Sequence, residues 1–114
     1  MTHGHHDHYA GAYDVVQLIS QEHGLFPRVY KRVMENLQTD KNRLVEHPEL
    51  SAILFNTREG DIFQVEEASL IVYETPGHIE DHLCFLLKEE GEPTYLFTGD
   101  HIIGADSVTH SLLI

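Results

Sequence analysis

Four histidines and one aspartate lie within six consecutive positions near the start of the chain, in the segment His3-Gly4-His5-His6-Asp7-His8. Neutral imidazole nitrogens and carboxylate oxygens are ligands for zinc and other borderline divalent metals. If the segment is extended, His3, His5 and Asp7 point to one side and His8 to the other, because side chains alternate along an extended chain. A turn within the segment could then direct one pair of donors to one metal and the second pair to another.

Two other interpretations of this segment are an expression tag and a histidine-rich tract without fixed geometry. A tag is a pure run of histidines, whereas Gly4 and Asp7 interrupt this one. A low-complexity tract would bind metal without matching donors elsewhere in the chain. Because later parts of the chain do offer such donors, we predict an ordered metal site.

The composition limits the size of the protein and its partners. A chain of 114 residues forms at most one domain, and 41% apolar residues are typical of a globular protein. Nineteen acidic residues against seven basic ones give a formal charge of −12. Nucleic acids are bound largely through lysine and arginine, so this charge argues against binding by charge alone, and no DNA partner is predicted. The excess of acidic residues is typical of a solvated surface.

The apolar segments also limit the class of protein. The only cysteine, Cys84, lies in the apolar run Leu83–Leu87, which predicts a buried thiol. No apolar run approaches the roughly 18 residues that a membrane-spanning helix needs, so no membrane partner is predicted.

Periodicity predicts a helix followed by short strands. Apolar residues recur at helical spacing from Ala10 to His23, and Gly24 is a suitable C-cap. A short strand is expected within Leu25–Val33 and a loop over Met34–Pro48. From residue 51 onward we expect five short strands: Ala52–Phe55, Ile62–Val65, Ala68–Tyr73, His82–Leu87 and Thr94–Phe97. The strand Ile62–Val65 could pair back on Ala52–Phe55.

Two further groups of polar residues follow predicted strands. Thr75-Pro76-Gly77-His78 comes after one strand, and Thr98-Gly99-Asp100 comes after another. Strand ends are where a rigid sheet can fix loop side chains, so His78 and Asp100 are candidate partners of the N-terminal histidines.

The three groups together resemble the metallo-β-lactamase superfamily. The resemblance implies an α/β (α+β) fold, part of a four-layered αββα sandwich of metal-dependent hydrolases. The runs Glu74–Leu83 and Leu96–Gly104 are most similar to the beta-lactamase-like protein 2 group, whose members are described as endoribonucleases acting on single-stranded RNA. The resemblance covers nearly the whole chain, so residues 1–114 are expected to form one partial domain.

By position, the resemblance implies two zinc ions. The first would be held by His3, His5 and His78. The second would be held by Asp7 and His8, and Asp100 would bridge the two.

The resemblance also implies catalytic roles. Asp7 would orient a metal-activated hydroxide and accept its proton. Asp81 and His82 follow His78 closely, and they are expected to hydrogen-bond to a ligand or to donate a proton to the leaving group.

The chain departs from the family pattern at its ends. The family supplies a further histidine to the second metal from a downstream Pro-Gly-His segment, and it has strands that precede the histidine-rich loop. Neither occurs in this sequence, so we expect a central fragment of the domain with an incomplete second metal site.

Three functional hypotheses follow. The first is a zinc-dependent endoribonuclease that cleaves single-stranded RNA, in the mitochondrial matrix or the cytoplasm as the resemblance implies. The second is a glyoxalase II-like thioesterase or a lactonase, acting on a small ester or thioester with the same metals. The third is a truncated, catalytically silent metal-binding product. The basic cluster Arg28, Lys31 and Arg32 is weak support for RNA, because it is equally typical of a solvated strand face.

Overall fold

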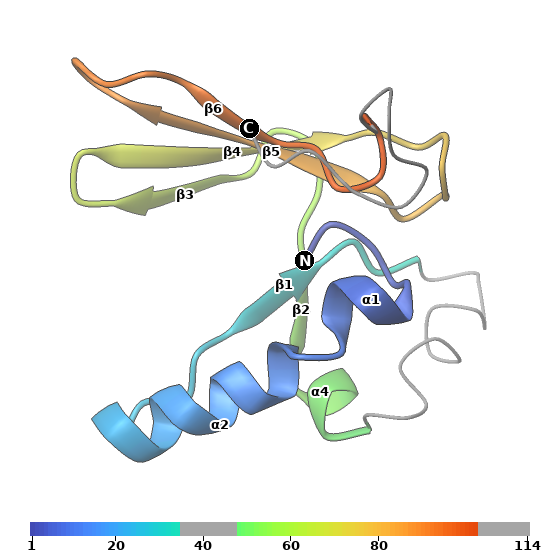
Figure 1. Ribbon diagram of the computed structural model, residues 1–114, viewed down its shortest axis with the longest axis vertical. Helices are drawn as coiled ribbons and strands as arrows, with labels where there is room; N and C mark the ends of the chain where they lie inside the picture. Colours follow the sequence, from blue (N-terminus) through green and yellow to red (C-terminus); the bar gives the residue numbers. More distant parts are fainter. Residues whose placement is uncertain (35–47, 103–114) are drawn as a thin grey trace.

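The structure is a computed structural model that describes residues 1–34 and 48–102. Its elements form two layers, which Figure 1 shows one above the other. The upper layer is an antiparallel sheet of β3, β4, β5 and β6, and the lower layer combines the parallel pair β1 and β2 with α1, α2 and α4. The bounds are α1 His6–Tyr9, α2 Ala12–His23, β1 Val29–Lys31, α4 Pro48–Ala52, β2 Leu54–Asn56, β3 Ile62–Val65, β4 Ala68–Glu74, β5 Leu83–Glu89 and β6 Tyr95–Phe97.

The predicted amphipathic helix is present as α2. It begins at Ala12 rather than Ala10, because Ala10 and Gly11 form the turn that separates it from α1. Gly24 ends it in the left-handed conformation, with φ of 63°, and donates its N–H to the carbonyl of Ser20 at 2.9 Å. A residue with a Cβ would be strained there, which explains the glycine. On its buried side, Val16 is 3% exposed.

The upper sheet carries one of the two apolar cores. All of its neighbouring strands are antiparallel, and Val72 of β4 is directly opposite Phe85 of β5. Val72, Leu83 and Phe85 are buried together, and three partly buried side chains pack against them: Phe63, Leu70 and Phe97. The strands predicted over Ile62–Val65, Ala68–Tyr73, His82–Leu87 and Thr94–Phe97 are confirmed: the first has the predicted boundaries, and those of the others shift by at most two residues.

The lower layer differs from the prediction around residue 52. Ala52 belongs to the short helix α4 rather than to a strand, and Leu54–Asn56 pairs in parallel with β1. The expected pairing of Ile62–Val65 back on the preceding strand is wrong, since β3 pairs with β4. Thr57 continues the parallel pairing, since its N–H donates to the carbonyl of Lys31 at 3.0 Å, and β3 follows from Ile62 in the other sheet. The loop predicted over Met34–Pro48 lies mostly outside the described residues.

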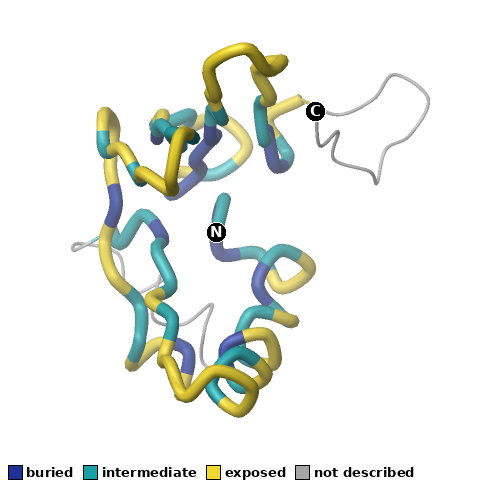
Figure 2. Tube along the Cα trace, turned by 90° about the vertical axis from the view of Figure 1, so that its left-hand side faces the viewer, coloured by how far each residue is buried: buried dark blue, intermediate teal, exposed yellow. Residues whose placement is uncertain are grey.

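The N-terminal segment joins the two layers. The Leu83 N–H in the upper sheet donates to the carbonyl of Thr2 at 2.7 Å. Figure 2 shows the N-terminus between the layers, with buried chain immediately after it, and His3 and Gly4 are buried. The mixed α/β fold class is thus confirmed. None of the helices in residues 1–34 and 48–102 is long and apolar enough to cross a membrane.

Candidate metal centre

Four side chains that the sequence singled out converge on one point. They come from three segments: the N-terminal segment, the loop after β4 and the loop after β6. Each offers one ligand atom, and these atoms all lie within 4.8 Å of one another in the group His3, His5, His78 and Asp100. Segments far apart in the sequence therefore meet at a single set of metal-binding donors.

The distances within this group are short. His5 Nδ1 lies 3.0 Å from His3 Nε2 and 3.0 Å from His78 Nε2. Asp100 Oδ2 lies 3.6 Å from His3 Nε2 and 3.2 Å from His78 Nε2. Three imidazoles and one carboxylate are a donor set of the type that binds zinc with four ligands. The residues present therefore fit a divalent transition metal.

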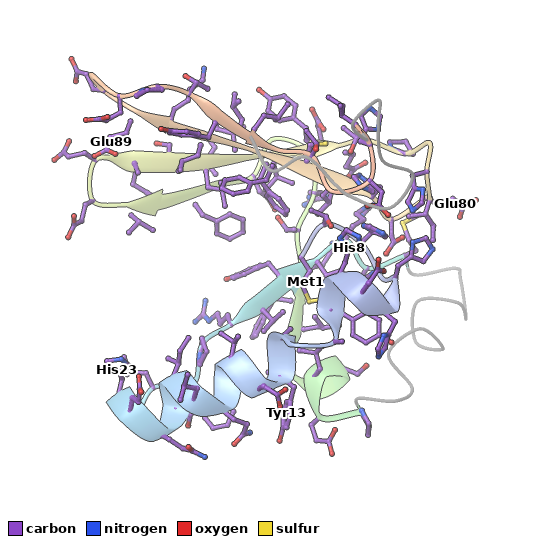
Figure 3. The ribbon with its side chains drawn as sticks, viewed as in Figure 1. Met1, His8, Tyr13, His23, Glu80 and Glu89 are labelled. Atoms are coloured by element: carbon purple, nitrogen blue, oxygen red, sulfur yellow. The ribbon has the colours of Figure 1, made fainter. Side chains whose placement is uncertain are left out.

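His8 extends the group on the other side of Asp100. Its Nε2 lies 3.0 Å from Asp100 Oδ1, so the two carboxylate oxygens face different sets of imidazoles. Figure 3 shows the labelled His8 at the top of α1, next to the upper layer. Asp7 lies on the same side as His8: its side chain is 77% exposed, and its Oδ2 lies 3.7 Å from the His8 Nε2 that faces Asp100. The segment is helical from residue 6 rather than extended, and Asp7 is not one of the four clustered donors.

Burial fixes the protonation state of His3. Its side chain is fully buried, and desolvation, aided by the neighbouring histidines His8, His82 and His5, lowers its pKa to about 3. The carboxylate of Asp100 opposes this shift. His3 is consequently neutral near pH 7, which is the form in which an imidazole binds a metal.

His82 lies behind the donors rather than among them. It is fully buried, and its Nε2 accepts a hydrogen bond from the Asp100 N–H at 3.1 Å. Burial, with His101 and His78 nearby, lowers its pKa to about 4. In the neutral ring the proton must then sit on Nδ1, which lies 2.9 Å from Thr75 Oγ1 and donates to it.

The hydrogen bonds continue from Thr75 to the end of β6. The Thr75 hydroxyl donates to Cys84 Sγ at 3.3 Å, and the Cys84 thiol lies 3.6 Å from the carbonyl of Thr98. Cys84 is 4% exposed, so the predicted buried thiol is confirmed. This chain of bonds connects the loop that carries His78 with the loop that carries Asp100.

The side chain of Asp81 contacts the backbone of the N-terminal segment. Its Oδ2 accepts a hydrogen bond from the Gly4 N–H at 2.9 Å and pairs with Lys31 Nζ at 2.6 Å. The interpretation of Lys31 as part of a solvated strand face is wrong, because its side chain is fully buried. No local sequence pattern predicts the burial of Lys31, since its partner Asp81 lies fifty positions away along the chain.

Comparison with known families and proteins agrees with this geometry. Residues 1–112 match the family described as the Metallo-beta-lactamase superfamily. The chain belongs to this superfamily. Within it, the chain is 36% identical over 109 residues to the atrochrysone carboxyl ACP thioesterase of Passalora fulva, covering 96% of this chain and 27% of that protein.

The chain is similar to further fungal proteins. The chain is 38% identical over 104 residues to the lactamase-like protein aptB of Emericella nidulans, which covers 91% of this chain and 26% of that protein. It is 32% identical to the atrochrysone carboxyl ACP thioesterase AacuM of Aspergillus aculeatus, with the same coverage. The chain thus spans about a quarter of the length of these relatives. Their names favour the thioesterase alternative and do not support the narrower resemblance to endoribonucleases, or the RNA partner and mitochondrial location that it implied.

Proposed function

We propose that this chain forms the metal-binding part of a hydrolase that cleaves acyl thioesters. The observation that carries the proposal is the convergence of His3, His5, His78 and Asp100 within 4.8 Å, in a chain similar to named thioesterases. The thioester substrate class comes from those relatives, and the hydrolytic chemistry from the donor set. A formal charge of −12 is unfavourable for RNA, which repels acidic surfaces.

The proposed ligands fall into two sets. His3, His5, His78 and Asp100 would hold the first zinc. Asp7 and His8, with the other oxygen of Asp100, would contribute to a second. When bound, such ions lower the pKa of water and polarise a carbonyl oxygen.

The remaining proposed roles belong to residues around the donors. Asp7, exposed beside His8, would accept the proton of the attacking water. His82 would fix the Asp100 backbone through its hydrogen bond, because both of its ring nitrogens are engaged inside the protein. Its complete burial favours this role over proton donation to a leaving group.

The test uses the purified protein with and without added zinc. We expect zinc-dependent release of free thiol from an acyl thioester, and no cleavage of an unstructured RNA. His78→Ala and Asp100→Asn should reduce the rate by more than the roughly 10- to 100-fold that is typical of losing an outer partner of a metal ligand. Lys88→Met, at the exposed end of β5, is the matched control and should retain the rate.

Two outcomes would contradict the proposal. Cleavage of RNA without thioester hydrolysis would assign the site to a phosphodiesterase. Tight zinc binding without turnover of either substrate would favour the catalytically silent alternative.

A further inference from the structure

A buried ion pair lies next to the N-terminal segment that carries His3 and His5. Lys31 ends β1 and its side chain is fully buried, while Asp81 comes just before β5 and its side chain is 3% exposed. Lys31 Nζ lies 2.6 Å from Asp81 Oδ2 and also donates to the carbonyl of Arg32 at 2.9 Å. The pair therefore joins the lower layer to the upper one.

Asp81 directs the same oxygen at the backbone between two proposed ligands. Its Oδ2 accepts the Gly4 N–H at 2.9 Å across 77 positions of sequence, and Gly4 separates His3 from His5. The residue on the other side of His3 is anchored as well, because the carbonyl of Thr2 accepts the Leu83 N–H at 2.7 Å. His3 is thus held by a backbone hydrogen bond on each side, both made to the segment that leads into β5.

We propose that Lys31 and Asp81 are positioning residues that set the backbone of Gly4, and with it the separation of the His3 and His5 nitrogens. This inference rests on the proposed metal centre. Lys31 supplies the opposite charge that a buried carboxylate requires, and its short contact fixes the direction in which that carboxylate faces. The hydrogen bond from the Gly4 N–H to this carboxylate then fixes the position of the Gly4 backbone.

Stability alone is a weak explanation for the pair. Burying two charges costs desolvation energy, and buried ion pairs can often be replaced by apolar side chains of similar size without loss of stability. What an apolar replacement cannot supply is an acceptor for the Gly4 N–H. The acceptor, rather than the charge, is therefore the property to test.

Two double variants separate the acceptor from the charge. Lys31→Met with Asp81→Asn removes both charges but leaves an amide oxygen that can accept from Gly4. Lys31→Met with Asp81→Leu removes both charges and the acceptor, with a side chain of similar size. Lys88→Met, exposed at the end of β5, controls for the loss of a lysine.

The first measurement is made on the metal-free protein. Hydrogen exchange of the Gly4 amide, followed by nuclear magnetic resonance, should be at least about 10-fold faster in the Leu double variant than in the Asn one. The second is zinc affinity, measured by competition with a chromophoric chelator. We expect the Leu double variant to bind zinc about 10- to 100-fold more weakly, and the Asn one to stay within a few-fold of the wild type.

A folded Leu double variant with wild-type Gly4 exchange and wild-type zinc affinity would overturn the inference. Equal losses in the two double variants would also overturn it, because the charge and not the acceptor would then matter. If the Leu double variant does not fold, Asp81→Ala replaces Asp81→Leu, with the same expectations. None of these readouts depends on thioester hydrolysis, so failure of the proposed substrate would leave the result for Lys31 and Asp81 intact.

Discussion

At the scale of single residues, Gly99 decides where Asp100 can lie. Its φ is 51°, a left-handed conformation that glycine adopts without strain. A Cβ at this position would lie 2.7 Å from His82 Nε2 and 2.9 Å from Thr2 Cβ. Gly99 therefore allows the loop after β6 to approach both the N-terminal segment and the ring that binds the Asp100 N–H.

Gly99→Ala should consequently destabilise the protein and weaken metal binding. The left-handed backbone costs a non-glycine residue about 1–2 kcal/mol, and the overlap with His82 adds to this. Gly60→Ala is the matched control, because its φ is 85° and nothing lies within 4 Å of the added Cβ. Chemical denaturation and zinc titration should show a larger loss of both stability and affinity for Gly99→Ala. Equal losses in the two variants would mean that the close approach at Gly99 is unimportant.

The sequence predicted the donors better than it predicted what holds them. His3, His5, His78 and Asp100 were identifiable because their spacing and residue types are specific to metal chemistry. Lys31 was not, because a buried lysine has the same local sequence as an exposed one. The turn that carries Asp7 and His8 was foreseen only as one option, because an extended segment fits the same residues.

At the scale of elements, α2 shows how one side of a helix contributes to the fold. Val16 is 3% exposed, whereas its neighbour Val15 is 54% exposed. Val16→Ala should lower the free energy of unfolding by about 2 kcal/mol, because two buried methyl groups are lost and a cavity forms. Val15→Ala should change it by less than about 0.5 kcal/mol. Denaturant unfolding of the two variants compares them directly, and similar losses would contradict the orientation of α2.

The turn between β2 and β3 depends on one carboxylate. Asp61 Oδ2 accepts hydrogen bonds from the Arg58 N–H at 3.1 Å and from the Thr57 hydroxyl at 2.9 Å. These bonds, with the backbone bond from Arg58 the larger cause, hold the pKa of Asp61 below its usual value of 3.8. The ionised form is therefore favoured by folding.

The consequence is a pH-dependent contribution to stability. The contribution is fully present above pH 3.8, where the carboxylate is ionised in both states, and it is lost as the pH falls through the lower folded-state pKa. Asp61→Asn should thus unfold at a lower temperature than the wild type at pH 7, with the difference shrinking below pH 4. Glu89→Gln, at the exposed end of β5, should show no such convergence. A constant difference across this pH range would refute the role of the Asp61 charge.

Periodicity was sufficient for α2 and for the strands of the upper sheet, because each has a clear pattern of its own. It was insufficient for the region around Ile53, where an apolar run fits a strand and a helix end equally well. The parallel pairing of Leu54 with Val29 depends on a partner distant in sequence, which a local pattern does not encode.

At the scale of the whole molecule, the two layers pack incompletely against each other. An open pocket of about 430 Å³ lies between them, lined mainly by aromatic and aliphatic side chains: Met1, Thr2, Tyr30, Phe63, Leu70, Phe85 and Phe97. The contacts of the N-terminal segment with the upper sheet therefore matter for holding the two layers together. The donor cluster is one of them, since His3 and His5 belong to that segment and His78 and Asp100 to loops of the upper sheet.

Removing a bound metal should accordingly lower the unfolding temperature of the whole chain. A ligand that binds only the folded state stabilises it by about 2.7 kcal/mol at 100 times its dissociation constant. Scanning calorimetry with zinc and after chelation should show this difference in the wild type. His78→Ala should show little of it, whereas Lys88→Met should respond like the wild type. An unfolding temperature that is unaffected by chelation would contradict metal binding at this cluster.

The separation of the donors along the chain has a consequence for biosynthesis. His5 and His78, whose rings touch, are 73 positions apart, and Asp100 follows later still. A ribosome makes His3 and His5 before His78 and Asp100, so the nascent chain exposes two imidazoles before the other donors exist. Closing so long a loop carries an entropy cost and makes its formation slow. The four-donor site can therefore be complete only after residue 100 has been synthesised.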